Sequence, residues 1–225
     1  IMQSTYPAAE RLPAPSQSLV EQTAGRLRAM ITSGEIGPGS RLSEARLTTE
    51  FDVSRNTLRE GFRLLTREGL LRHEPNRGVF VETPTMATIL DIYRVRRAIE
   101  VPAIAHSWSR HRAVERMRLA VDTAEDMALR PDWRAVGSAN MEFHAAIVAL
   151  TDSPRLMAFY AQVATELRLA FGVLDSPEML HAPYITMNRE IVRLVETGEA
   201  QRAAEALDAY LLKSERTLLE AFARL

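Results

Sequence analysis

Residues 53–69, VSRNTLREGFRLLTREG, decide the fold of the amino-terminal part of the chain. Ser54 is a typical N-cap, because its hydroxyl can accept a hydrogen bond from one of the unpaired amides that open a helix. Leu58, Phe62 and Leu65 follow at helical spacing and predict one buried stripe. The arginines of the segment fall largely off that stripe. Such a helix suits the major groove of DNA, although cationic amphipathic helices also occur as plain solvated surfaces.

The segment before this helix favours the DNA-binding interpretation. Apolar spacing predicts a helix over 18–31. The glycines and proline of SGEIGPGSRL (33–42) predict a loop that no helix can cross. A second helix is expected over 44–51, with Ser43 as its N-cap. The order is therefore helix, loop, helix, short turn and recognition helix.

The segment after the helix completes a winged helix-turn-helix. Two short apolar runs, 70–73 and 79–81, flank the turn-rich tip Asn76-Arg77-Gly78 and predict a two-stranded wing. Six arginines and three glutamates lie between Val53 and Val79, whereas the whole chain has a net charge of −1. Positive charge is thus concentrated where a phosphate backbone would lie.

The stretch that begins SLVEQTAGRL and ends NRGVFV resembles the DNA-binding domain of the GntR family of bacterial transcriptional regulators. Four separate blocks carry the resemblance in the right order: SGEIGPGSRLSE, VSRNTLRE, EGLL and NRGVFV. In that family the arginines of the VSRxxxR stretch and the wing tip contact the operator. The resemblance therefore implies that the following residues bind DNA: Arg55, Asn56, Thr57, Arg59, Asn76, Arg77 and Gly78.

Composition is that of an ordinary globular protein, with 46% hydrophobic and 25% charged residues. No segment predicts a membrane span or a secretion signal, and we expect a cytoplasmic protein. Cysteine is absent, which excludes disulfides and cysteine-based zinc sites. We expect a flexible arm over 1–16, a winged helix-turn-helix domain over 17–82, a linker over 83–86 and an all-α domain over 87–225.

The carboxy-terminal part predicts helices only, which makes the fold class mainly α. Short connections around Asp152 and Gly198 are typical of a helical bundle. We expect Trp108, Trp133 and Phe171 to lie in its core. Apolar spacing predicts about six helices, near 86–110, 112–129, 132–150, 154–173, 180–197 and 200–224.

This part resembles the FCD domain of the FadR subfamily, the domain that binds the ligand and forms the dimer. The matching pieces are RVRRAIE (94–100), EFHAAIVALTDSPRL (142–156) and REIVRLVETGEAQRAAEALDAYL (189–211). The resemblance implies a divalent metal held by one Asp and three His inside the bundle. The equivalent positions here are Asn140, His144, Asn188 and Tyr210, so that His144 alone is retained. Amides and a phenol are poor ligands for a transition metal, and a bound metal is disfavoured.

The four positions still predict a polar site if the helices converge. Asn140, His144, Asn188 and Tyr210 could bind an effector directly, or they could satisfy one another inside the core. Arg96 is the natural partner for an effector carboxylate. It could instead form an i,i+4 salt bridge with Glu100, a pair worth only about 0.2–0.5 kcal/mol on a helix surface. His181 could replace a lost metal ligand, but Pro183 is expected to break the helix before Asn188.

The function expected from these observations is a ligand-responsive regulator, acting as a repressor and binding a palindromic operator as a homodimer. Its effector would be a small organic acid or a related metabolite. A metal-dependent sensor with a rearranged metal site is one alternative. An enzyme is another, but the chain shows no paired carboxylates beside a histidine, no phosphate-binding loop and no nucleophile with a placed base.

Overall fold

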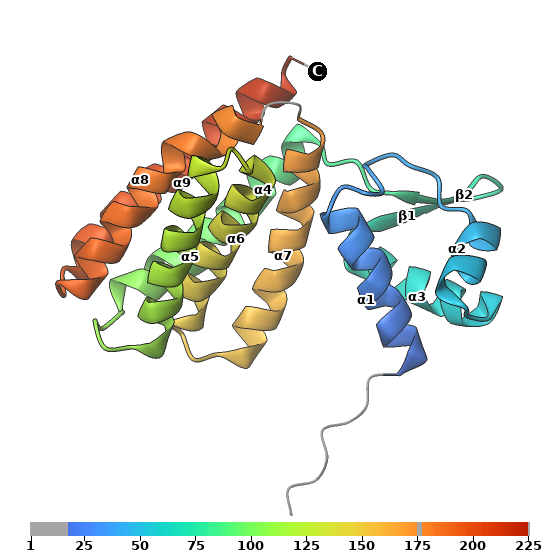
Figure 1. Cartoon of the computed structure of the whole chain (residues 1–225), viewed down its shortest axis with the longest axis horizontal. Coiled ribbons are helices and arrows are strands. Elements are labelled where there is room, and N and C mark those ends of the chain that lie inside the picture. Colours follow the sequence, from blue (N-terminus) through green and yellow to red (C-terminus); the bar gives the residue numbers. More distant parts are fainter. Residues whose placement is uncertain (1–17, 175–176, 225) are drawn as a thin grey trace, which may run out of the picture.

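The computed structural model describes residues 18–174 and 177–224, so the expected arm over 1–16 lies outside the described residues. The described chain forms two parts that lie side by side (Figure 1). Three helices and a two-stranded hairpin form the head, and helices α4 to α9 form a bundle. Helix α7 of the bundle faces helix α1 of the head (Figure 1). The expected fold class is confirmed.

Serine caps begin the three helices of the head. Their bounds are α1 Leu19–Thr32, α2 Glu44–Phe51 and α3 Arg55–Arg67. The hydroxyls of Ser18, Ser43 and Ser54 each accept a hydrogen bond from a backbone N–H of the first turn. Asp52 then closes α2 in the left-handed conformation, with φ of 54°. Local sequence therefore sets both the starts of these helices and the turn between α2 and α3.

The wing is a hairpin of β1 (Leu71–Glu74) and β2 (Gly78–Val81), paired antiparallel. A third segment, which the sequence analysis treated as loop, joins it. The backbone N–H of Leu42 donates to the Val79 carbonyl, and the N–H of Val81 donates to the Ser40 carbonyl, both at 2.9 Å. The segment before α2 thus runs alongside β2 and fixes the wing against the head.

Apolar side chains at the predicted spacing fill the core of the head. Leu58, Phe62 and Leu65 are all buried, as their spacing predicts. Leu169 of α7 belongs to the same apolar cluster, although it lies in the bundle part of the chain. Arg168 next to it donates through Nε to the Thr32 carbonyl at the end of α1, at 2.7 Å. Apolar and polar contacts therefore both join the two parts.

The bundle consists of six helices in the described part of the chain. Their bounds are α4 Met86–Ala105, α5 Arg112–Leu129, α6 Trp133–Ala149, α7 Pro154–Gly172, α8 Pro177–Glu196 and α9 Ala200–Phe222. The first ends at Ala105, earlier than expected, and His106 after it bonds to the Pro102 carbonyl through both its backbone N–H and its ring. None of the described helices is long and apolar enough to cross a membrane.

The expected break at Pro183 is wrong, because α8 runs through it without interruption. A proline removes one backbone N–H, which here leaves the carbonyl of Met179 without its helical donor. Met179 is 68% exposed, so water can hydrogen-bond to that carbonyl. His181 and Asn188 therefore lie on one continuous helix.

Candidate functional site

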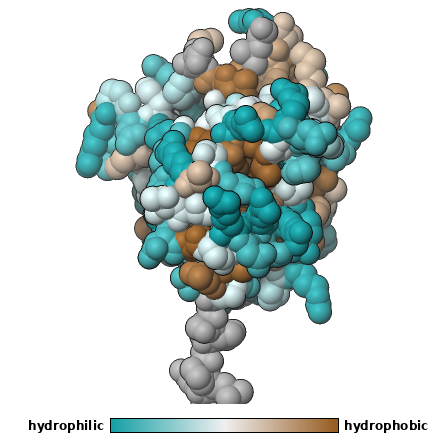
Figure 2. Space-filling view, turned by 90° about the vertical axis from the view of Figure 1, so that its right-hand side faces the viewer, coloured by the Kyte–Doolittle hydropathy of each residue, from teal (hydrophilic) through white to brown (hydrophobic). Residues whose placement is uncertain are grey.

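The exposed face of α3 carries the residues expected to contact DNA. Arg55, Asn56 and Arg59 are exposed and Thr57 is partly buried, whereas the opposite face is packed into the core. Figure 2 looks onto the head and shows a surface that is mostly hydrophilic, with smaller apolar areas between the polar side chains. The chemistry of this face is hydrogen-bond donation from guanidinium and amide groups, which suits base edges and phosphates.

Arg59 is held in place by a carboxylate of the neighbouring helix. Its Nε lies 3.1 Å from both carboxylate oxygens of Glu44 in α2. This ion pair fixes the direction in which Arg59 leaves α3. Because the pair is exposed, its attraction is weak enough in water for the guanidinium to exchange Glu44 for another acceptor.

The wing lies close enough to α3 to form a groove with it. A hollow of about 780 Å³ lies between Arg59, Arg63 and Arg67 on one side and His73 and Gly78 on the other. At the expected tip, Asn76 and Arg77 are exposed, and Arg77 pairs with Glu74. Asn76 and Gly78 have φ of 61° and 114°, which a tight turn requires. The helix and the wing therefore present cations to one groove.

Arg41 is a further cation at this surface that the sequence analysis missed. It is exposed, and its Nε lies next to Gly78, since a Cβ atom added at Gly78 would be 3.4 Å from it. Arg41 forms a β-bridge with Phe80, which brings it to the wing. The alternation of apolar and polar residues around Leu42 was the available signal for a short strand.

Glu100 is the centre of a buried polar cluster inside the bundle. Its carboxylate accepts hydrogen bonds from Arg96 Nε at 2.8 Å, His144 Nδ1 at 2.6 Å and the Tyr160 hydroxyl at 2.7 Å. All four side chains are almost completely buried. We call these four residues the Glu100 network. The network joins α4, α6 and α7.

The charges of the Glu100 network neutralise each other. Burial alone would raise the pKa of Glu100, but Arg96 and His144 lower it to about 2. The carboxyl is therefore ionised and balances the Arg96 guanidinium. Arg96 does form the i,i+4 pair with Glu100, but the pair is buried rather than exposed. The small interaction energy expected for an exposed Arg96–Glu100 pair is therefore wrong. Breaking a buried pair leaves an uncompensated charge, which costs far more.

Asn140, Asn188 and Tyr210 form a second polar group next to the network. The Oδ1 of Asn140 accepts from Asn188 Nδ2 at 2.7 Å and from the Tyr210 hydroxyl at 3.1 Å. The rings of His144 and Tyr210 lie 4.9 Å apart between their centroids. The structure thus brings all five expected effector-site residues together, with Arg96 linked to the others through Glu100. Glu100 and Tyr160 were missed as site residues because spacing alone does not reveal burial.

Two buried polar atoms of this region have no hydrogen-bond partner among the described residues, His144 Nε2 and Asn188 Oδ1. Burial lowers the pKa of His144 despite the attraction of Glu100, so the imidazole is neutral near pH 7. Its Nδ1–H then donates to Glu100, which leaves Nε2 as an acceptor. Two acceptors without donors therefore lie inside the bundle.

These residues do not fit the metal site that the FCD resemblance implies. His144 is the one imidazole among the four ligand positions, and the other three offer two amides and a phenol. Burial raises the pKa of Tyr210, so its hydroxyl stays protonated. The described residues contain no group of three or more His, Asp or Glu that could hold an ion. The two open acceptors suit a neutral hydrogen-bond donor better than they suit a transition metal.

Of the aromatic residues expected in the core, Trp133 and Phe171 are partly buried and pack against apolar clusters of the bundle, but Trp108 is not in the core. Trp108 is 59% exposed at the end of the bundle. Trp133 and Phe171 line a cavity between the bundle and the head, together with His181. Spacing predicted their helices correctly, but it could not show that the head leaves a hollow beside them.

The head and the bundle together define a class, a transcriptional regulator with a DNA-binding domain and a separate effector domain. The chain belongs to the GntR family of bacterial regulators, in the FadR subfamily that carries an FCD domain. "Bacterial regulatory proteins, gntR family" matches residues 19–81, and "FCD domain" matches residues 91–213. This is a family of transcriptional regulators and not of enzymes.

Known relatives match most of the chain. A GntR transcriptional regulator from Rhodococcus sp. RHA1 is 37% identical and superposes with a TM-score of 0.86, over 90% of this chain and 98% of its own. The Nta operon transcriptional regulator of Aminobacter aminovorans is 29% identical over 85% of this chain and 90% of its own. The galactonate operon transcriptional repressor of Escherichia coli is 29% identical over 64% of this chain and 72% of its own.

Proposed function

We propose that this chain is a repressor that works in the cytoplasm and binds a palindromic operator as a homodimer. A small organic acid or a related metabolite releases it from DNA. The observation that carries the proposal is the exposed cationic face of α3 beside the wing. The galactonate operon relative is named as a repressor, which supports repression rather than activation.

In this proposal, Arg55 and Arg59 read bases from the major groove, with Asn56 and Thr57 beside them. A two-fold operator matches a two-fold protein, and half-site spacing then follows from the distance between the two heads. The wing tip, Asn76 to Gly78, contacts the adjacent backbone and positions the helix. Arg59 exchanges Glu44 for a base or a phosphate on binding.

The face of the bundle that dimerises would contain exposed apolar side chains. The first turns of α7 expose Leu156, Met157 and Phe159 at 37%, 39% and 47%. Apolar side chains gathered on one surface mark interaction sites more often than isolated ones do. Sedimentation of the chain at micromolar concentration tests the dimer, and a monomer under these conditions would contradict it.

The DNA contacts are tested with Arg55→Ala and Arg59→Ala, using duplexes that the wild-type chain selects from a random pool. Each substitution should weaken specific binding by about 1–3 kcal/mol, because each removes a hydrogen-bonding pair to a base. Arg216→Ala is the matched control, since it removes one exposed arginine from the bundle. Unchanged affinity and sequence preference in both head variants would contradict the assignment.

The effector is tested by thermal shift with small carboxylates and sugar acids, because binding to the native state raises the melting temperature. The open acceptors His144 Nε2 and Asn188 Oδ1 would bind hydroxyl groups of the effector beside Asn140 and Tyr210. Arg96 would take its carboxylate by exchanging it for Glu100. Metal analysis of the purified chain checks the alternative of a metal-dependent sensor. One tightly bound transition metal per chain would contradict our interpretation of the amides and the phenol.

A further inference from the structure

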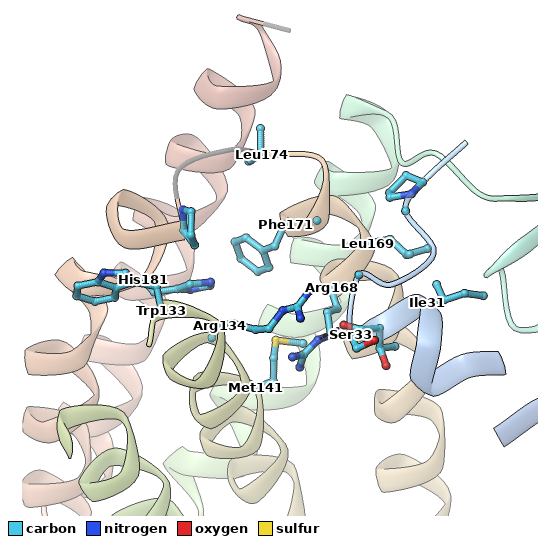
Figure 3. A pocket seen from close by; sticks show the side chains of 17 residues that line it. Ile31, Ser33, Trp133, Arg134, Met141, Arg168, Leu169, Phe171, Leu174 and His181 are labelled. Carbon is cyan, nitrogen blue, oxygen red and sulfur yellow. Dashed lines mark hydrogen bonds between the residues drawn. The ribbon is translucent and has the colours of Figure 1, made fainter. Parts of the chain in front are cut away.

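A cavity of about 290 Å³ separates the head from the bundle, apart from the Glu100 network. We call it the junction cavity. Its head wall is the end of α1 and the following loop, including Thr32 and Gly34, and its other walls are α6, α7 and α8. Figure 3 shows its side chains, with Arg134 and Arg168 near the middle of the view. Its volume is at the lower end of the range for ligand pockets, which suits a ligand of a few atoms.

The junction cavity has two arginines and no carboxylate among its described lining residues. Arg134 and Arg168 make no ion pair within residues 18–174 and 177–224. Both side chains line this one cavity, and burial first and the charge of Arg134 second lower the pKa of Arg168. Most arginines of the bundle have an acidic partner, as Arg97 and Arg189 do. Two guanidinium groups with no acidic partner among the described residues favour the binding of an anion.

Arg168 also has hydrogen-bonding capacity left for a ligand. Its Nε donates to the Thr32 carbonyl, and its NH2 donates to the Ser138 hydroxyl. These two bonds hold the guanidinium in one place against both parts of the molecule. No hydrogen bond to its NH1 is formed by the described residues. Arg134 donates to none of them and is exposed, so it can turn toward a ligand.

A buried histidine on the same wall lacks a partner. His181 in α8 is 92% buried, and its Nδ1 has no hydrogen-bond partner among the described residues. Burial and Arg168 lower its pKa to about 4, so the ring is neutral near pH 7. Gly137 leaves room for this ring, because a side chain there would lie 2.7 Å from His181 Nε2. A buried polar atom without a partner costs about 1–3 kcal/mol, which a bound ligand can recover.

We propose that the junction cavity binds a small oxyanion, a phosphate or a short carboxylic acid, between Arg134 and Arg168 with His181 as a further hydrogen-bonding group. The anion replaces the missing carboxylate and gives the two guanidinium groups charge-assisted hydrogen bonds. This site is additional to the effector site inside the bundle. It does not require that the chain binds DNA. Because Arg168 is bonded to the head through Thr32, the anion lies where it can influence how the head is held.

Intrinsic fluorescence provides the test, since the chain contains two tryptophans and Trp133 lines the junction cavity. Trp108→Phe removes the other, which is largely exposed. We would titrate this single-tryptophan chain with inorganic phosphate and, separately, with malonate, at constant ionic strength. A saturable change in Trp133 emission is expected with one of the two. The one that saturates at lower concentration identifies the chemical class.

Arg134→Met and Arg168→Met, each in the Trp108→Phe chain, decide whether the arginines bind the anion. Either should raise the half-saturating concentration at least tenfold. Arg134→Met is the safer variant, because the side chain of Arg134 makes no hydrogen bond to a described residue. Arg216→Met is the control for general charge effects and should leave the titration unchanged. The proposal is overturned if neither anion gives a saturable change, or if both cavity variants titrate like the control.

Discussion

The Glu100 network and the junction cavity contain the same kinds of side chain but differ in one group. Each combines arginine with a buried histidine, but among the described residues only the Glu100 network includes a carboxylate. In the Glu100 network the charges and hydrogen bonds are largely satisfied, and the cluster ties helices together. At the junction cavity the cations have no counterion among the described residues. We infer from this difference that a carboxylate within the chain decides whether an arginine stabilises the fold or stays available to a ligand.

Removal of the carboxylate from the network should have the largest effect. Glu100→Gln leaves Arg96 buried without a negative partner, which should destabilise the chain by about 3–5 kcal/mol. Urea unfolding measures the loss. Glu115→Gln is the control, because Glu115 is exposed and its pair with Arg118 should be worth less than about 1 kcal/mol. Equal losses in the two variants would show that the network is not an ion-pair cluster.

Removal of the Asn140 amide should have the next largest effect. Asn140→Ala takes the acceptor from Asn188 Nδ2 and from the Tyr210 hydroxyl at once. Buried donors without a partner should cost about 1–3 kcal/mol in unfolding free energy. Tyr210→Phe removes the hydroxyl donor itself, so that no unpaired donor is left at this position, and it should cost less. A greater loss for Tyr210→Phe than for Asn140→Ala would contradict this assignment.

His181, which has no carboxylate partner among the described residues, should make the unfolding free energy fall at acidic pH. Burial and Arg168 hold the pKa of His181 near 4, whereas an unfolded histidine has a pKa of about 6.5. Between those values the unfolded chain takes up a proton that the folded chain does not, so stability falls as pH falls. The expected loss between pH 7 and pH 5 is about 2 kcal/mol. His181→Asn should reduce the loss of urea resistance by that amount, and an unchanged pH dependence would contradict the prediction.

The smallest effect is expected at Arg134, the junction arginine whose side chain makes no hydrogen bond to a described residue. Arg134→Met should change the unfolding free energy by no more than about 0.5 kcal/mol, since the Arg134 side chain is exposed and forms no hydrogen bond with the described residues. A slight gain is expected, because the substitution removes repulsion from Arg168. Thermal unfolding measures the difference. A loss above about 1 kcal/mol would mean that Arg134 supports the fold.

The sequence predicted the parts of the fold that depend on local chemistry. Ser43 and Ser54 predicted where α2 and α3 begin, and the spacing of Leu58 and Phe62 predicted the buried face of α3. The pairing of Leu42 with Val79 was missed because it joins segments far apart in the chain. Such pairing depends on how the loop folds back, which no local pattern records.

The candidate sites were predictable to different degrees. The positions of Asn140, Asn188 and Tyr210 followed from the family resemblance, and their helices do converge. The Arg96–Glu100 spacing was visible, but its burial was not, because burial depends on α6, α7 and α9, which pack against α4. The junction cavity could not be predicted, since Thr32 and Arg168 are brought together only by the packing of α1 on α7.

The segment between α1 and α2 has a mechanical consequence. Its first residues, including Gly34 and Pro38, line the junction cavity, and its last, Ser40 and Leu42, are hydrogen-bonded to β2 of the wing. One short stretch of backbone therefore connects the wall of the junction cavity to the wing. If the cavity widened, this segment would shift, and the wing tip at Asn76 would tilt with it. We therefore expect the orientation of the wing to follow the distance between the two parts of the molecule.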